Sequence, residues 1–409
     1  MLDWQSCIAS QACCLRREGL DLEKRKRPEF DRKIRPSTII IICLVLVMLS
    51  AGATYFFVMR DFGSKQYLDD AKKYVEIEKI INESYIGETD TQSLYDAAAA
   101  AMVKSIDDKW SYYMSPEQYE AYKLTSSNEY AGIGASVKLN NSGEFEISDI
   151  EEGTPAHSAG LKPEQIILSV DGESVAGKTL EEVSTLIRSK LNKNFDILLR
   201  DTDGDEITVT LACEIIFRNP VSSRLIDGHV GYVKISNFEA GSSENAINAV
   251  EKLISAGADS FVFDLRNNPG GLLTELVDLL DYILPEGDIF VSIDKNGKET
   301  VQTSDKIALS NKMVVIVNAN TFSAAEFFAA ALQEYEWAAV VGDQTTGKAR
   351  SQVTVELSDG GAVHISTHKY LTPERKDLSE IGGVTPDIPV TKGSAEGDSY
   401  LDAAIKALG

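Results

Sequence analysis

The most prominent feature of the hydrophobic pattern is an uninterrupted apolar run from Ser37 to Met59. It covers 23 residues without a charged side chain. As a helix it is about 34 Å long, at about 1.5 Å per residue. The run therefore predicts a transmembrane helix over 37–59. Ala51-Gly52-Ala53 also fits the cleavage site of a removable signal peptide, but the apolar run continues past it to Val58, which favours a retained anchor.

Three further patterns follow along the chain. Apolar residues at helical spacing, as in YVEIEKIINESYI, predict an N-terminal helical region over 64–127. Short strand-like stretches separated by glycines, with one helical segment LEEVSTLIRSKL, predict a compact β-rich module over 128–216. From 217 to 392, strand-like runs such as SFVFDL and MVVIV alternate with helix-like runs, which predicts an α/β core with a mostly parallel sheet flanked by helices. Residues 393–409 are expected to form a helical segment.

Charge is distributed unevenly along the chain. Residues 1–36 hold nine Lys/Arg and six acidic residues, a balance of +3 against −23 for the whole chain, which leaves −26 for residues 60–409. The basic segment 1–36 is expected to stay in the cytoplasm, so the body after Arg60 is expected outside it. An acidic body repels phosphate backbones, which argues against nucleic-acid binding. Cys213 is the single cysteine after the apolar run, so the body has no internal disulfide, and no Cys/His spacing typical of a metal site is present.

Three loops of unusual composition follow predicted strands of the core: RNNPGG, NANTFS and DQTTGK. Ligands of open α/β sheets collect outside the carboxyl ends of the strands, so these loops meet if their strands are neighbours. In NTFSAAE, Ser323 stands at a strand-to-helix turn, where a nucleophile can be exposed. The same pattern is that of a capping box, in which the serine hydroxyl accepts the Glu326 amide. Taken alone, the pattern favours the cap.

No histidine lies within thirty positions of Ser323, so a serine nucleophile needs another base. A lysine in an apolar site loses pKa and can serve as the general base for serine. Lys348, 25 residues after Ser323, is the candidate; alone it is equally a solvated loop lysine. Pro-Gly-Gly at 269–271 is a sharp turn before a helix, and its glycines also let backbone N–H groups approach an oxyanion.

Five stretches make residues 67–392 resemble the C-terminal processing peptidases, also called tail-specific proteases, which are serine peptidases with a Ser-Lys dyad and an embedded PDZ domain. The stretches are YAGIG, DLRNNPGGLL, NTFSAAE, VGDQTTGKARSQ, and HKYLTP followed by GGVTPDI. The resemblance implies a crotonase/ClpP-like core with Ser323 as nucleophile and Lys348 as general base. No metal, nucleotide or other cofactor is expected. The chain departs from the family at Ala349, usually a glycine, and at Asn320 and Phe322, where small residues are common.

The resemblance also assigns supporting roles around the nucleophile. The oxyanion would be held by the amide of Ala324 and by one from Gly270 or Gly271. Gln352 would orient the lysine four residues before it. On a fully extended strand such residues lie roughly 13 Å apart, so this role requires a bend near residues 347–350.

Residues 128–216 resemble a PDZ domain. The amides of Gly132-Ile133-Gly134 would bind a substrate's terminal carboxylate, and Val183 and Ile187 on the following helix would line the pocket for its last side chain. The alternative for these apolar residues is a place in the core. Arg188, beside them, is a candidate for relaying peptide binding to the active site.

The expected function is that of a membrane-anchored, extracytoplasmic serine endopeptidase, bacterial in source, which recognises protein C-terminal tails and cleaves upstream of them. Its partners would be proteins or peptides with exposed C-termini and the membrane, and the helical region is a candidate homodimer surface. One alternative is a PDZ-bearing scaffold with a silent peptidase core. Another is an acyl-CoA enzyme on a related α/β core, because architecture alone does not fix function.

Overall fold

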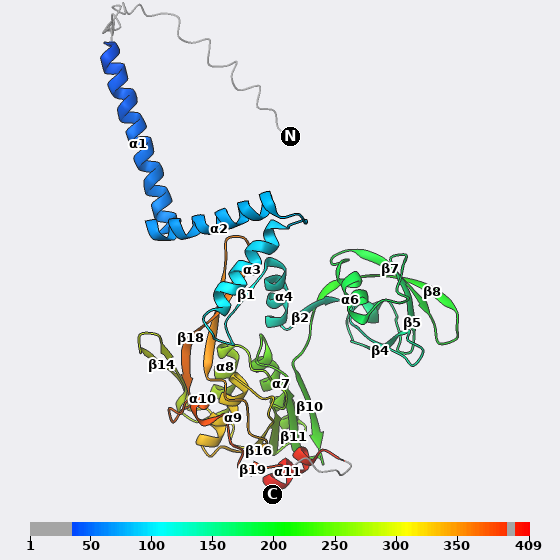
Figure 1. Ribbon diagram of the computed structural model, residues 1–409. Helices are drawn as coiled ribbons and strands as arrows, with labels where there is room; N and C mark the ends of the chain where they lie inside the picture. The colour runs from blue at the N-terminus through cyan, green and yellow to red at the C-terminus, as the bar shows by residue number, and fades with distance from the viewer. Residues whose placement is uncertain (1–34, 391–396) are drawn as a thin grey trace, which may run out of the picture. The chain divides into compact units, whose positions relative to one another are not determined.

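The computed structural model describes residues 35–390 and 397–409 (Figure 1). The chain divides into two compact units, with the division between Thr91 and Gln92. The predictions made for the basic segment up to residue 34, and for residues 391–396, lie outside the described residues.

The first unit contains two long helices, α1 (Pro36–Phe62) and α2 (Lys65–Ser84). Pro36 occupies the first turn of α1, where its missing N–H costs nothing. Over Pro36–Arg60 this helix is long and apolar enough to cross a membrane by length and composition, and none of that stretch is buried. These properties are shared by membrane anchors and signal sequences. Ser64 starts α2, and its hydroxyl accepts the Tyr67 amide at 3.3 Å.

Two helices and a short strand precede the β-rich module: α3 (Thr91–Lys104), β1 (Tyr112–Met114) and α4 (Pro116–Ser126). Ser115 begins α4 with a complete capping box shared with Gln118. β1 pairs antiparallel with a strand of the α/β core, β18 (Ala362–Leu371), where Tyr112 lies opposite His364. This pairing fixes the segment before β1 to the core.

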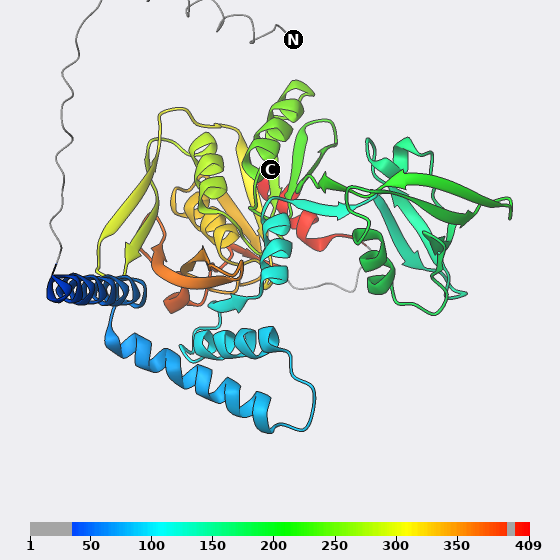
Figure 2. The ribbon, with the colours of Figure 1, turned by 90° about the horizontal axis from the view of Figure 1, so that it is seen from above.

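In the β-rich module the strands gather into one group, with the short helices α5 and α6 beside them (Figure 1 and Figure 2). β2 and β9 pair at its base, and the larger sheet runs β3-β4-β5-β7-β8 with β6 on β5. A capping box at Thr179 starts α6, which packs on β2, β3 and β5. The elements are β2 (Glu129–Gly132), β3 (Ala135–Leu139), β4 (Phe145–Ile150), α5 (Pro155–Ser158), β5 (Ile166–Val170), β6 (Glu173–Ser174), α6 (Leu180–Arg188), β7 (Asn194–Arg200), β8 (Glu206–Ala212) and β9 (Glu214–Phe217).

The core is built on a six-stranded sheet in the order β10-β11-β12-β15-β16-β19. β10 is antiparallel to β11, and the other neighbours pair in parallel. Helices α7, α8 and α9 pack on one face and α11 on the other. The strands are β10 (Val221–Ile226), β11 (Val230–Ile235), β12 (Ser260–Asp264), β15 (Lys312–Val317), β16 (Ala338–Gly342) and β19 (Ile388–Pro389). The helices are α7 (Ser242–Ser255), α8 (Leu273–Ile283), α9 (Ala324–Glu334) and α11 (Ser399–Leu408).

A second core sheet is antiparallel. It runs β1-β18-β13-β14, with β17 on β18, and α10 (Leu378–Ile381) lies after it in the chain. Its strands in the core are β13 (Gly287–Asp294), β14 (Glu299–Ser304), β17 (Arg350–Glu356) and β18 (Ala362–Leu371). The prediction of one mostly parallel sheet is thus correct only for β11 to β19. SFVFDL and MVVIV revealed the parallel strands because strands buried on both faces are continuously apolar, whereas β10, β13 and β14 mix polar and apolar residues.

Candidate active site

The three unusual loops meet at one edge of the parallel sheet. The register places Asp264 beside Ile316 and Val317 beside Gly342, so β12, β15 and β16 end together. Backbone hydrogen bonds then tie the loops to one another: the Phe322 amide donates to the Asn268 carbonyl oxygen at 3.1 Å. Asn320, one of the departures from the family pattern, adds a side-chain bond to Asn267 at 3.0 Å.

Ser323 lies at a strained strand-to-helix turn. Its backbone angles are φ 59° and ψ −130°, a conformation that L residues rarely adopt. The turn carries a capping box shared with Glu326, whose carboxylate accepts the Ser323 amide at 2.9 Å, and the Glu326 amide donates to the Ser323 backbone carbonyl oxygen at 2.8 Å. The residue is 9% exposed. The turn therefore starts α9 with a cap and also has the geometry that holds a nucleophile at a sheet edge.

Glu326 connects the serine to the lysine loop. Its carboxylate is fully buried. One oxygen accepts the backbone amides of Ser323 at 2.9 Å and of Lys348 at 2.8 Å, and the other accepts the Gly347 amide at 2.6 Å and the Thr345 hydroxyl. The sequence indicated Glu326 only as part of a helix cap. Its bonds to the lysine loop depend on the pairing of β15 with β16, which no local pattern encodes.

The glycine loop lies directly against the serine. A Cβ on Gly270 would approach the Ala324 nitrogen and the Ser323 Cβ to 2.8 Å, so only glycine fits there. The Gly270 amide is occupied, because it donates to the Asn268 side chain at 2.8 Å. Among the described residues the amides of Gly271 and Ala324 donate to no partner. Of the two glycines named from sequence, Gly271 is thus the one with a free donor.

Lys348 is half-buried beside Phe322, the residue before Ser323. Its Nζ lies 4.4 Å from the ring centroid of Trp110 and 5.9 Å from that of Phe322. Within the described ranges, Nζ makes no hydrogen bond or ion pair. Burial lowers the pKa of the Lys348 ammonium, against the opposing charges of Asp108 and Glu326. The lysine is therefore a desolvated amine, not a solvated loop side chain. Ala349 next to it is fully buried in the core.

Gln352 forms no hydrogen bond with Lys348 within the described residues. Its Nε2 donates to the Arg350 carbonyl oxygen at 3.1 Å and to the Ser366 hydroxyl at 3.0 Å. A register irregularity lies between Ser351 and Gln352, but it leaves the amide pointing along the β17–β18 pair. The structure thus brings Ser323, the glycine loop and Lys348 together, and holds Gln352 in the neighbouring hairpin.

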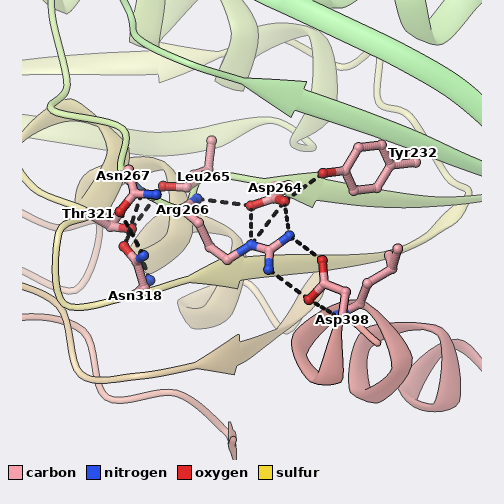
Figure 3. Close-up of polar contacts among 9 residues, drawn as sticks. Tyr232, Asp264, Leu265, Arg266, Asn267, Asn318, Thr321 and Asp398 are labelled. Carbon is pink, nitrogen blue, oxygen red and sulfur yellow. Dashed lines mark hydrogen bonds and ion pairs between the residues drawn. The ribbon is translucent and has the colours of Figure 1, made fainter. Parts of the chain in front are cut away.

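An ion-pair network joins the end of β12 to the start of α11 through Arg266 (Figure 3). Asp264, at the end of β12, is fully buried and accepts the Tyr232 hydroxyl at 2.6 Å and Arg266 Nε at 2.9 Å. The Arg266 guanidinium continues to Asp398 at the start of α11, with two bonds of 2.8 Å. Sequence reasoning missed this network. The signal in the sequence was the charged pair Asp264 and Arg266 at the end of the apolar strand SFVFDLR.

The proposed peptide-binding residues lie together in the β-rich module. Gly134 has φ +79°, and a Cβ there would lie 2.1 Å from the Thr154 side chain. The amides of Ile133 and Gly134 donate to no described partner, while the Ile133 side chain is buried. Val183 and Ile187 on α6 both belong to the buried core of the module. Arg188, the last residue of α6, is exposed.

Known proteins resemble this chain in both parts. Residues 229–390 match peptidase family S41, and residues 146–201 match the PDZ domain. The carboxyl-terminal-processing protease of Synechocystis sp. is 31% identical over 348 residues, 78% of this chain and 81% of the relative. The carboxy-terminal processing protease CtpA of Bacillus subtilis is 30% identical over 376 residues, 90% of this chain and 80% of the relative. A solved S41 protease structure from Bacteroides fragilis has a TM-score of 0.51 at 18% identity, covers 79% of this chain and 92% of its own, and indicates a shared fold.

Proposed function

The chain belongs to peptidase family S41 and is a C-terminal processing serine peptidase with a PDZ domain, and on this premise we propose that Ser323 is its nucleophile and Lys348 its general base. The observation that carries the proposal is the shared oxygen of Glu326, which accepts both backbone amides. A strained serine and a desolvated lysine are thereby held in one hydrogen-bonded frame.

The proposed reaction is peptide hydrolysis through an acyl-enzyme. Ser323 Oγ forms a bond to the substrate carbonyl carbon while its proton passes to Lys348 Nζ. The C–N bond then breaks, and the leaving amine takes that proton from the lysine. Water repeats the steps on the ester: its proton passes to Lys348, the acid product leaves, and Ser323 recovers its proton.

The oxyanion of each tetrahedral intermediate needs donors beside the serine. The Gly271 and Ala324 amides would supply them, because neither donates to a described partner. Ala324 directly follows Ser323, and Gly271 follows Gly270, which packs against Ser323. The N-terminus of α9 adds its partial positive charge at the same point. The Asp264–Arg266–Asp398 network holds the glycine loop in place for this role.

Substrate choice is assigned to the PDZ domain. The free amides of Ile133 and Gly134 fit the docking of a terminal carboxylate, and α6 with Val183 and Ile187 would border the last side chain. The substrates proposed are proteins with exposed C-terminal tails, cut upstream of the tail. Arg188 remains the proposed relay, since it is exposed at the end of the same helix.

We place the protein in a membrane by α1, with the body outside the cytoplasm. The length and composition of Pro36–Arg60 support this location, and a cleaved signal sequence is the alternative. A homodimer through the helical region is proposed on α2, which buries none of its residues.

The test uses the full chain in detergent with unfolded proteins that carry apolar or charged C-terminal tails. Wild type should cleave the preferred class and react with an active-site serine probe, and Ser323→Ala should do neither. Equal cleavage by both would remove Ser323 as nucleophile. Lys348→Ala should fold and lose nearly all turnover. A silent scaffold would instead bind tail peptides without hydrolysis even at saturation.

A further inference from the structure

The ammonium group of Lys348 is partnered by aromatic rings. Nζ lies 4.4 Å from the Trp110 ring centroid, and the rings of Trp110 and Phe322 stack at 6.1 Å with an interplanar angle of 28°. Nζ forms no hydrogen bond with the Ser323 hydroxyl or any other described group. In this structure the proposed base therefore rests on a ring face and is not hydrogen-bonded to the hydroxyl whose proton it is to accept.

Trp110 is held rigidly in this place. The Asp108 carboxylate accepts the Trp110 amide at 3.2 Å and also the Ser111 hydroxyl. Ser111 Oγ in turn accepts the Ser366 amide of β18 at 3.0 Å. The ladder between β1 and β18 continues from that point. These bonds fix the Trp110 backbone against the core, and its ring stacks on Phe322 and lies over Lys348 Nζ.

An aromatic ring acts on a lysine in two opposite ways. It excludes water, which disfavours the charged amine. Its negative face also attracts the ammonium, which favours the charged amine by an interaction that strengthens when the site is desolvated. A leucine at the same position would keep most of the water exclusion and lose the attraction, so substitution separates the two effects.

We propose that Trp110 is a positioning residue that holds the charged Lys348 ammonium at rest on its ring, and that the amine serves Ser323 only after leaving it. The inference rests on the Ser323/Lys348 mechanism proposed above. Phe322, directly before the serine, forms the second wall of this aromatic site. The ring would set the pH above which the base becomes available.

Other charged groups act on Lys348 as well, and they must be controlled. They come from the segment before β1, the loop after β11, α9 and β18, and they are Asp108, Lys109, Glu239, Glu326 and His364. Lys109 Nζ also lies 4.5 Å from the Trp110 centroid. Burial and the Glu275 charge raise the pKa of Glu239 to about 7, so Glu239 titrates within the neutral range. The measurement is therefore made in a Glu239→Gln background.

The experiment compares Trp110, Trp110→Phe and Trp110→Leu in that background, as full chains in detergent. The readout is the pH dependence of kcat/KM for the tailed protein substrate that wild type cleaves. With leucine the midpoint should move to lower pH, and kcat/KM below the midpoint should rise about 3- to 10-fold. Phenylalanine should give a midpoint between the two, because its ring attracts a cation less strongly.

Trp337→Leu is the matched control, since Trp337 packs against the core and bonds to the Leu309 carbonyl oxygen at 3.1 Å, and it is no partner of Lys348. It should leave the midpoint unchanged. An unchanged or raised midpoint in both Trp110 variants would overturn the inference, as would an equal loss of rate at every pH. If the leucine variant fails to fold, the phenylalanine midpoint decides. If wild type cleaves nothing, the proposed function itself fails.

Discussion

Ser323 and Lys348 donate their backbone amides to the same oxygen of Glu326, at 2.9 and 2.8 Å, although they are 25 residues apart in the chain. A single buried carboxylate thus fixes the start of α9 and the start of the β17 segment together. Any movement of one loop is transmitted to the other through this oxygen, so the relative position of nucleophile and base depends on a residue that reacts with neither.

Glu326→Gln should lower both stability and activity. The amide nitrogen of glutamine cannot accept a backbone N–H, so at least one amide is left unsatisfied in a buried site, at about 2–4 kcal/mol. We expect kcat/KM to fall at least about 100-fold, because roughly 1 Å of misplacement has that effect. Glu334→Gln on the same helix is the control: it weakens bonds to Thr372 and Glu374 and the ion pair with Lys376, away from the serine and lysine loops. Equal activity loss in both would contradict the role of Glu326.

Gly271→Ala should abolish activity through the backbone. A Cβ at this position would lie 2.2 Å from the Phe238 carbonyl carbon, so the loop must shift and carry the free amide with it. Loss of one oxyanion donor lowers kcat by about 10²–10³-fold. Gly297→Ala, also at positive φ but in open space, should leave kcat unchanged. Measured kcat within about threefold of wild type for Gly271→Ala would remove the loop from the oxyanion site.

Glu239→Gln should stabilise the protein at alkaline pH. Burial raises the pKa of this carboxyl to about 7, so its contribution to stability is full below the unfolded value and is lost as pH rises through about 7. The glutamine variant avoids that loss, by roughly 1–2 kcal/mol at pH about 8 after allowance for solvent screening. Its stability should match wild type near pH 4. Denaturant unfolding at both pH values measures the difference.

Glu275→Gln should change the pH dependence of stability in the opposite direction, and it is the comparison variant for Glu239→Gln. Its carboxylate accepts bonds from Gly241, Ser242 and Ser243, which lower its pKa. Its stabilisation is present above the unfolded value and is lost as pH falls. The glutamine variant should therefore be less stable than wild type at neutral pH. The same sign of effect in both variants would contradict the two assignments.

Arg266→Met should loosen α11. Asp264 is fully buried, and removal of its cationic partner costs about 3–5 kcal/mol. Hydrogen exchange in residues 399–408 should accelerate, because the bonds from Arg266 to Asp398 are lost as well. Arg375→Met breaks only exposed pairs with Asp288 and Glu299 and should change stability by less than about 1 kcal/mol. Unchanged hydrogen exchange in α11 after Arg266→Met would contradict the role of the Asp264–Arg266–Asp398 network in holding that helix.

Gly134→Ala should separate recognition from chemistry. The new Cβ would lie 2.1 Å from the Thr154 side chain, which forces the loop of free amides to move. Tail-peptide affinity should fall at least about tenfold, while labelling of Ser323 by a serine probe persists. Gly143→Ala is the control, with a similar φ of +76° and open space around it. Loss of probe labelling together with unchanged peptide binding would contradict the assignment.

The sequence predicted the parts of the site that are contiguous in the chain. NTFSAAE, RNNPGG and the lysine loop each follow an apolar strand, and their meeting follows from the parallel order of β12, β15 and β16. The contacts made across the chain could not be predicted. Arg266 and Asp398 are 132 residues apart, and Trp110 approaches Lys348 only because β1 pairs with β18.

The assignment of Gln352 shows a second limit of prediction from sequence. Spacing placed it on the same strand as the lysine, and its hydrogen bonds are decided by Ser366 across the hairpin. The capping box predicted at Ser323 is present, since the Glu326 carboxylate accepts the Ser323 amide at 2.9 Å, and it coexists with the strained turn at φ 59°. At Gln352, tertiary structure chose between alternatives that the local pattern left open.

The backbone angles of Ser323 are those that suit glycine, and glycine there would relieve strain of order 1–3 kcal/mol. On the proposed mechanism the hydroxyl is nevertheless required. Folding and turnover therefore favour different residues at this one position. A search for more thermostable variants of this protein should accordingly return inactive ones at residue 323, so selection for heat resistance alone would discard the peptidase.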